Sequence, residues 1–123
     1  MTTILIVEDQ PDIRKLGRLT LDRADREITE ATDGESAWAA IQAKCPDIVL
    51  LDIMMPGQPD GLQLCERIKG DQATCRAKVV LVSARGHRND MVIGRQAGAD
   101  EYILKPFSPS RLAEVVQALS PPG

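Results

Sequence analysis

The sequence has few aromatic residues: its 123 positions include one tryptophan, one tyrosine and one phenylalanine. Its core must therefore be built from leucine, isoleucine, valine and alanine, and the aromatic platforms that bind single-stranded nucleic acid are not expected. Basic residues are outnumbered too, because the formal net charge is −3. That balance argues against a basic footprint for nucleic acid, so we expect no direct nucleic-acid binding by this domain.

Paired metal-binding or disulfide-forming residues are also scarce. The single histidine is His87, and Cys45, Cys65 and Cys75 form no CxxC pair, which argues against a zinc site. Free thiols in a reducing cytoplasm are the simplest account of three cysteines. No apolar run approaches the length that spans a bilayer, and Met1 leads almost directly into a strand-like run. We therefore expect a cytoplasmic protein without a signal peptide or membrane segment.

Short apolar runs alternate with amphipathic segments along the whole chain. The predicted strands cover Thr3–Val7, Glu27–Ala31, the run that ends at Asp52, Lys78–Ser83 and Glu101–Lys105. The first predicted helix begins at Pro11, the second begins at Asp33, and the third ends near Gly70. The last two cover Asn89–Ala97 and Pro109–Leu119. This alternation predicts an α/β domain with a single five-stranded parallel sheet and helices on both faces. The domain is expected to span 1–120, with 121–123 as a tail or the start of a linker.

The helical segments carry apolar residues at helical spacing. The residues expected to face the sheet are Ile13, Leu16, Thr20, Leu21, Ala37, Ala40, Ile41, Leu64, Cys65, Ile68, Leu112, Val115, Val116 and Leu119. The helix over Asn89–Ala97 is the least well specified. Gly94 lies within it and costs about 1 kcal/mol relative to alanine.

The run Ile48-Val49-Leu50-Leu51 places four apolar residues directly before Asp52. Such a run is typical of a strand buried on both faces of a parallel sheet. Asp52 then falls at the carboxyl end of that strand, where ligands bind in open α/β sheets. From this stretch alone, Asp52 either begins a turn, where aspartate is common, or serves chemistry at the sheet edge.

Polar residues stand at the ends of other predicted strands as well. Glu8 and Asp9 follow the first strand, Ser83 ends the fourth and Lys105 ends the fifth. Plain structural explanations exist, since Asp9 can cap the first helix, and Ser83 and Lys105 can simply stand where strands meet water. Because the carboxyl ends of parallel strands lie at one edge, we expect these residues to converge with Asp52.

The expected cluster of three carboxylates suggests cation binding and phosphoryl transfer. Clustered carboxylates raise one another's pKa unless a cation relieves them. Mg²⁺ suits an all-oxygen site and leaves room for a phosphoryl oxygen. A carboxylate is also a nucleophile toward phosphorus, and phosphoryl transfer needs mainly positioning and charge stabilisation. Mg²⁺, Lys105 and the hydroxyl of Ser83 would then contact the phosphoryl oxygens.

Four motifs carry a resemblance to a known family. They read Val7-Glu8-Asp9, Leu51-Asp52-Ile53-Met54-Met55-Pro56-Gly57, Val82-Ser83-Ala84 and Leu104-Lys105-Pro106-Phe107. With them the chain, from Ile4 to about Leu119, resembles the receiver domains of two-component response regulators, the chemotaxis-regulator-like family. The resemblance implies a flavodoxin-like (βα)5 fold with strand order 2-1-3-4-5, in which Glu27–Ala31 is an edge strand.

The resemblance also assigns roles at the site. It implies that Asp52 is the phosphoacceptor and that Mg²⁺ is the cofactor. Asp9 would be a direct metal ligand, Glu8 would act through water, and the backbone carbonyl of Met54 would be a further ligand, which allows its side chain to be apolar. Lys105 would contact the phosphoryl group and precede a cis proline.

The same resemblance implies a switch and its partners. Ser83 and Tyr102 match the hydroxyl and aromatic positions whose rearrangement transmits phosphorylation. The phosphoryl donor would be a sensor histidine kinase or a phosphotransfer protein. An output domain, a partner protein or a second phosphorylated copy would bind the face formed by 89–119. The domain would not be an enzyme, since it would catalyse only its own phosphorylation and dephosphorylation.

This chain departs from the family pattern in two places. The acidic pair is Glu-Asp, where many members have Asp-Asp, which is a mild variation. The loop over 56–61 is one residue longer than the frequent Pro-Gly-Met-Asp-Gly form. The second departure leaves the path of the loop open without affecting Asp52.

Three other interpretations start from the same residues. A hydrolase similar to the haloacid-dehalogenase phosphatases needs a second aspartate two positions after its nucleophile, where this chain has Met54. A flavodoxin-like flavin carrier needs a Ser/Thr-rich phosphate loop after the first strand, where Glu8 and Asp9 would repel a phosphate. A degenerate receiver that only binds partners is disfavoured by the intact acidic pair together with Asp52, Ser83 and Lys105.

Overall fold

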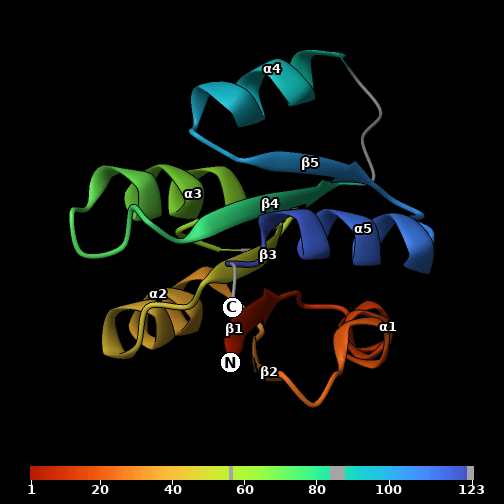
Figure 1. Cartoon of the computed structure of the whole chain (residues 1–123). Coiled ribbons are helices and arrows are strands. Elements are labelled where there is room, and N and C mark those ends of the chain that lie inside the picture. The colour runs from red at the N-terminus through yellow and green to blue at the C-terminus, as the bar shows by residue number, and fades with distance from the viewer. Residues whose placement is uncertain (56, 84–87, 122–123) are drawn as a thin grey trace.

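The computed structural model describes residues 1–55, 57–83 and 88–121, with side-chain surroundings given for all of them except 88–91. Within these ranges, five strands and five helices alternate (Figure 1). The strands are β1 (Thr2–Val7), β2 (Arg26–Ala31), β3 (Ile48–Asp52), β4 (Lys78–Ser83) and β5 (Glu101–Leu104). The helices are α1 (Pro11–Leu21), α2 (Gly34–Ala43), α3 (Gly61–Gly70), α4 (Arg88–Gln96) and α5 (Pro109–Leu119). All strand pairs are parallel and the order is β2-β1-β3-β4-β5, which confirms the predicted flavodoxin-like architecture.

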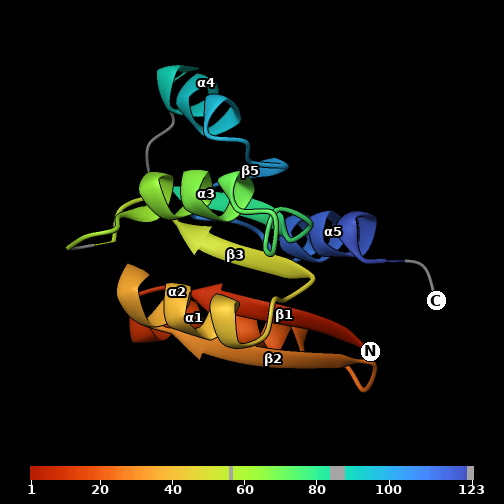
Figure 2. The ribbon, with the colours of Figure 1, turned by 90° about the vertical axis from the view of Figure 1, so that its left-hand side faces the viewer.

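The sheet lies between two layers of helices, as Figures 1 and 2 show. Successive residues of a strand point to opposite faces, so each central strand contributes to two cores. One core packs under α2 and α3 and includes Leu5, Val7, Val49, Leu51, Val79 and Leu81. The other packs under α1 and α5 and includes Ile4, Ile6, Ile48, Leu50, Val80 and Val82. This double burial explains why the central strands are unbroken apolar runs.

Two helical residues predicted to face the sheet are exposed instead. Leu16 is 40% exposed, and Ala40 also faces solvent. In α1 the residues buried against the sheet are Gly17 and Leu21, and a methyl group on Gly17 would lie 3.5 Å from the side chain of Ile6. In α2 the contact is made by Ala37 and Ile41. The other predicted faces of α3 and α5 are buried or half-buried.

The fifth strand was predicted to end at Lys105, which is one residue too far. The N–H of Lys105 still donates to the carbonyl oxygen of Ser83 at 2.7 Å, but Pro106 has no N–H to continue the ladder, so β5 ends at Leu104. The Lys105–Pro106 bond is cis, as the resemblance implied, and Gln58–Pro59 is cis too. The bounds of β1, β2 and α4 also differ from the predicted ones by a single residue. Among the described helices, none is both long enough and apolar enough to cross a lipid bilayer.

Candidate metal centre at the carboxyl edge of the sheet

Three carboxylates meet where β1 and β3 end. The two strands are paired so that Val7 lies opposite Leu51, which places Glu8 and Asp52 at neighbouring positions one residue further on. One carboxylate oxygen from each of Glu8, Asp9 and Asp52 lies within 4.8 Å of the others. Glu8 and Asp52 are almost fully buried, with 3% and 4% exposure, whereas Asp9 faces solvent. The cluster is therefore a pocket with one open side.

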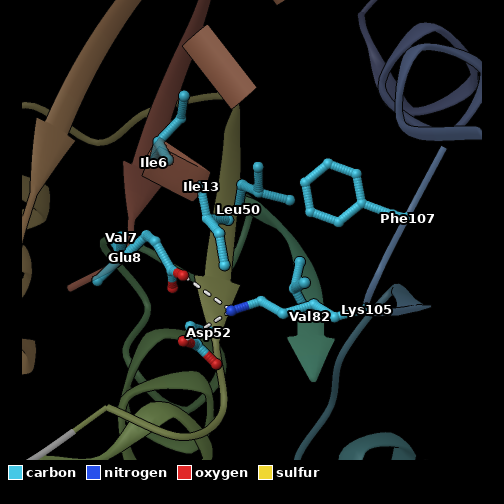
Figure 3. Close-up of a pocket in the computed structure, with 9 residues that line it drawn as sticks. All are labelled: Ile6, Val7, Glu8, Ile13, Leu50, Asp52, Val82, Lys105 and Phe107. Carbon is cyan, nitrogen blue, oxygen red and sulfur yellow. Dashed lines mark hydrogen bonds and ion pairs between the residues drawn. The ribbon is translucent and has the colours of Figure 1, made fainter. Parts of the chain in front are cut away.

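Lys105 brings a positive charge into this pocket from the end of β5. Its Nζ lies 2.8 Å from Oε1 of Glu8 and 3.2 Å from Oδ2 of Asp52 (Figure 3). The side chain of Lys105 is only 13% exposed, so both ion pairs are largely shielded from solvent. Burial lowers the pKa of this lysine, but its contacts with Glu8 and Asp52 outweigh that effect and raise the pKa overall. Lys105 therefore remains charged.

Asp52 is held as a carboxylate on both of its oxygens. Oδ1 accepts a hydrogen bond from the N–H of Met54 at 2.9 Å, and Oδ2 faces Lys105. Burial alone would raise the pKa of Asp52, but interactions with Glu8, the Met54 N–H and Lys105 together lower it below its usual value. The side chain is thus ionised and oriented by backbone and lysine donors.

The pKa of Glu8 is shifted in the opposite direction from that of Asp52. Burial, followed by the neighbouring Asp52 carboxylate, raises the pKa of Glu8 to about 8, against the opposing effect of Lys105. Its Oε2 is buried and has no hydrogen-bond partner among the described residues. An unpartnered buried carboxylate oxygen is costly, and a bound cation would satisfy it. Three clustered oxygen donors fit a hard divalent ion, and this orphan oxygen supports that fit.

The structure brings most of the predicted site residues together. Glu8, Asp52 and Lys105 are in direct contact, as expected from the strand ends. Ser83 is fully buried at the end of β4, one residue beyond the register partner of Asp52. Tyr102 lies apart from the carboxylates, half-buried in β5 and packed against the core under α2 and α3.

Two predicted motifs extend beyond the described residues, because Pro56 and Ala84 lie outside them. Met54 was expected to bind the metal through its backbone carbonyl, and the structure shows its backbone N–H directed at Asp52. The side chain of Met54 is 50% exposed, so it does not occupy the carboxylate cluster.

One feature of the site was not anticipated from the sequence. An apolar wall flanks the charged groups around a cavity of about 10 Å³ (Figure 3). Its apolar residues are Ile6, Val7, Ile13, Leu50, Val82 and Phe107. Phe107 follows Lys105 in the Lys-Pro-Phe motif, so the motif could have indicated that Phe107 lies near the site. The helical spacing of Ile13 indicates only that it faces the sheet. An apolar wall lowers the local dielectric and strengthens the ion pairs of Lys105.

Comparison with known proteins agrees with this geometry. A model of the response regulator receiver domain matches residues 4–117. The phosphate regulon transcriptional regulatory protein PhoB of Pseudomonas aeruginosa is 38% identical over 117 residues, which cover 95% of this chain and 51% of that protein. The transcriptional regulatory protein ResD of Bacillus subtilis is 41% identical over 118 residues, which cover 96% of this chain and 48% of that protein. The chain thus spans about half the length of these curated relatives.

Solved structures show the same similarity. The receiver domain of NtrX from Brucella abortus has a TM-score of 0.86 at 37% identity, covering 94% of this chain and 96% of that chain. The chemotaxis protein CheY4 of Vibrio cholerae has a TM-score of 0.88 at 25% identity, covering 97% of this chain and 98% of that chain. These matches decide against the phosphatase and flavin-carrier interpretations. The acidic pocket at the carboxyl edge, the strand order and the matched sequence together show that this chain belongs to the receiver domains of two-component response regulators.

Proposed function

We propose that Asp52 accepts the phosphoryl group and that this receiver domain is a phosphorylation-dependent switch. The observation that supports the assignment most directly is the state of the Asp52 carboxylate. It is oriented by the Met54 N–H and Lys105, its pKa is held below the usual value by its neighbours, and two further carboxylates that can hold a cation lie beside it. A nucleophile at phosphorus needs this combination of free electron pairs, fixed direction and nearby positive charge.

In the proposed step, an oxygen of Asp52 forms a bond to phosphorus. The bond from phosphorus to the nitrogen of a donor phosphohistidine breaks, and the electron pair stays on that imidazole nitrogen, which then takes up a proton. The donor is a sensor histidine kinase or a phosphotransfer protein. With acetyl phosphate as a small donor, the bond from phosphorus to the carboxyl oxygen breaks and acetate leaves. Lys105 supplies positive charge to the phosphoryl oxygens throughout.

The cofactor proposed for this pocket is Mg²⁺. Asp9, Asp52 and the backbone carbonyl of Met54 would hold it directly, and Glu8 would act through water. When bound, it would neutralise charge that accumulates on the phosphoryl oxygens. The chain's own residues do the rest: Met54 and Lys105 orient the Asp52 nucleophile, and the apolar wall limits the access of water to the site.

The proposed response begins with the added charge and acceptor oxygens on Asp52. Ser83 and Tyr102 are the proposed switch residues, and 89–119 form the proposed output face for an output domain, a partner or a second copy. The switch would act in the cytoplasm and would catalyse only its own phosphorylation and dephosphorylation. The receiver domain would span 1–120, with 121–123 as a tail or the start of a linker, and would not itself bind nucleic acid.

Intact-mass spectrometry tests the proposal. Wild-type protein incubated with acetyl phosphate and Mg²⁺ should gain the mass of one phosphoryl group, and chelation of Mg²⁺ should prevent the gain. Asp52→Asn, which is nearly isosteric, should remain folded and unmodified. Modification of that variant at the wild-type rate would show that Asp52 is not the acceptor. An unmodified wild type would favour a degenerate receiver that serves only as a binding module.

A further inference from the structure

The first residue of α2 touches the backbone of the loop between β3 and α3. A methyl group built on Gly34 would overlap with the carbonyl oxygen of Pro59 and would lie 3.0 Å from Cγ of its ring. The overlap is with backbone rather than with the end of a flexible side chain. Any side chain at position 34 therefore requires the loop or the helix to move.

The same C-terminal end of the loop also lies against the end of the acceptor strand. A methyl group built on Gly61, the first residue of α3, would overlap with the carbonyl oxygen of Asp52. Asp60 lies between the two contacts and caps α3: its carboxylate accepts from the N–H of Gln63 at 2.9 Å, and its own N–H donates to the Gln63 side chain at 2.9 Å. The backbone contacts therefore run without a break from α2, through Pro59 and α3, to Asp52.

The helix is the firmer of the two partners in this contact. Ala37 and Ile41 anchor α2 in the core with exposures of 0% and 1%. Its N-terminus is capped by Asp33, whose carboxylate accepts from the N–H of Ser36 at 2.7 Å. The loop, in contrast, exposes Gly57 and Gln58 to solvent. A side chain at position 34 would consequently displace the loop in preference to α2.

We propose that Gly34 is a positioning residue for the Asp52 site, because it admits the Pro59 carbonyl and so fixes the loop that carries Met54. This inference rests on the proposed function, in which Asp52 and the Met54 carbonyl hold the metal and Asp52 takes the phosphoryl group. Gly34 touches none of the reacting atoms. It acts through Pro59, and a displacement of about 1 Å at such a site can cost about 100-fold in rate.

The test compares two glycine-to-alanine variants. Gly34→Ala adds a methyl group against backbone, whereas Gly70→Ala adds one where no described atom lies within 4 Å. We expect Gly34→Ala to weaken Mg²⁺ binding about tenfold, the lower end of the effect of second-shell changes on metal affinity. Its phosphorylation by acetyl phosphate should slow as well, while Gly70→Ala matches wild type in both. Calorimetric titration and intact-mass kinetics, run well below the unfolding temperature, measure these effects apart from stability.

A spectroscopic readout follows the loop directly. The Met54 N–H, which donates to Asp52, should shift its amide resonance in Gly34→Ala and not in Gly70→Ala. If Gly34→Ala does not fold while Gly70→Ala does, the contact serves the fold as a whole and the positioning role is overturned.

The outcomes separate this inference from the proposed function. A wild type that neither binds Mg²⁺ nor gains a phosphoryl group defeats the proposed function, and the Met54 resonance then still tests the position of the loop. A functional wild type matched by Gly34→Ala in Mg²⁺ affinity, rate and Met54 resonance overturns the positioning role.

Discussion

Lys105 lies closer to Glu8 than to the proposed phosphoacceptor: its Nζ is 2.8 Å from Oε1 of Glu8 and 3.2 Å from Oδ2 of Asp52. Glutamate is one methylene longer than the aspartate that many receivers carry at this position, and the extra length extends its carboxylate toward the lysine. Among the described residues, Lys105 is the cation that pairs with these two carboxylates. Metal binding and lysine pairing therefore draw on the same carboxylate charge.

Removal of Lys105 should affect metal binding and phosphorylation in opposite directions. In Lys105→Ala, the carboxylates lose their resident positive charge, so Mg²⁺ should bind more tightly. Phosphorylation by acetyl phosphate should nevertheless slow about 100-fold, because one fixed donor to the phosphoryl oxygens is lost. Calorimetry and intact-mass kinetics measure the two quantities.

A second lysine provides the control for this experiment. Lys69 forms an ion pair with Asp100, with 2.7 Å between Nζ and Oδ2, and it lies outside the carboxylate cluster. Lys69→Ala should change the stability of the fold but leave Mg²⁺ affinity and phosphorylation rate near those of wild type. Unchanged affinity and rate in Lys105→Ala would contradict the shared-charge interpretation.

The N-cap of α2 should make stability depend on pH below neutrality. Asp33 accepts hydrogen bonds from the hydroxyl and the N–H of Ser36 at 2.6 and 2.7 Å, and these bonds lower the pKa of Asp33. A carboxylate whose pKa is lower in the folded state stabilises the fold above its unfolded pKa of about 3.9 and loses that contribution as the pH falls further.

Urea unfolding at neutral pH and near pH 3 should reveal this dependence. Asp33→Ala should be less stable than wild type at neutral pH, and the difference should shrink at low pH as the wild-type carboxylate protonates. Asp33→Asn keeps a capping acceptor without a titratable group, so it should lack this contribution to the pH dependence. An Asp33→Ala deficit that stays constant down to low pH would show that the charge of the cap is unimportant.

The three cysteines should separate sharply in a thiol titration. Cys65 is fully buried in α3, and its Sγ lies 3.5 Å from the carbonyl oxygen of Ala97. Burial raises the pKa of Cys65 to about 11, so little thiolate is present at neutral pH. Cys45 and Cys75 are exposed. We expect two thiols per chain to react promptly with a disulfide reagent in the native state and the third only after denaturation. Three prompt thiols would contradict this burial.

The sequence was most informative where one rule of physics acts alone. Continuous apolar runs predicted the doubly covered strands, and the shared edge of parallel strands predicted that Glu8, Asp52 and Lys105 converge. Contacts between segments that are distant in the sequence produce no comparable pattern of residues. Nothing in local spacing indicates that Pro59 lies against Gly34, because both residues read as ordinary turn and helix-start signals. Distances and burial, which decide the charge of Glu8, required coordinates for the same reason.

The position of α4 suggests how a phosphoryl group at Asp52 would be sensed. A methyl group built on Gly94 would lie 3.1 Å from Cδ1 of Leu81 and 3.3 Å from Cδ2 of Tyr102, so glycine lets this helix lie close over the proposed switch tyrosine. Val92 and Ile93 on the same helix are 48% and 43% exposed. A helix with an internal glycine and exposed apolar residues is weakly anchored and therefore easily shifted.

Hydrogen exchange with and without beryllofluoride, which mimics the phosphoryl group, should detect this shift. With Mg²⁺ present, we expect protection to change across 88–107, which include α4 and Tyr102, and to change much less across 36–44 in α2. Ser83→Ala should reduce the change in 88–107 while Asp52 remains able to accept a phosphoryl group, because Ser83 ends β4 between the acceptor strand and β5. Equal changes in both segments, or a full response in Ser83→Ala, would show that the signal leaves the site by another route.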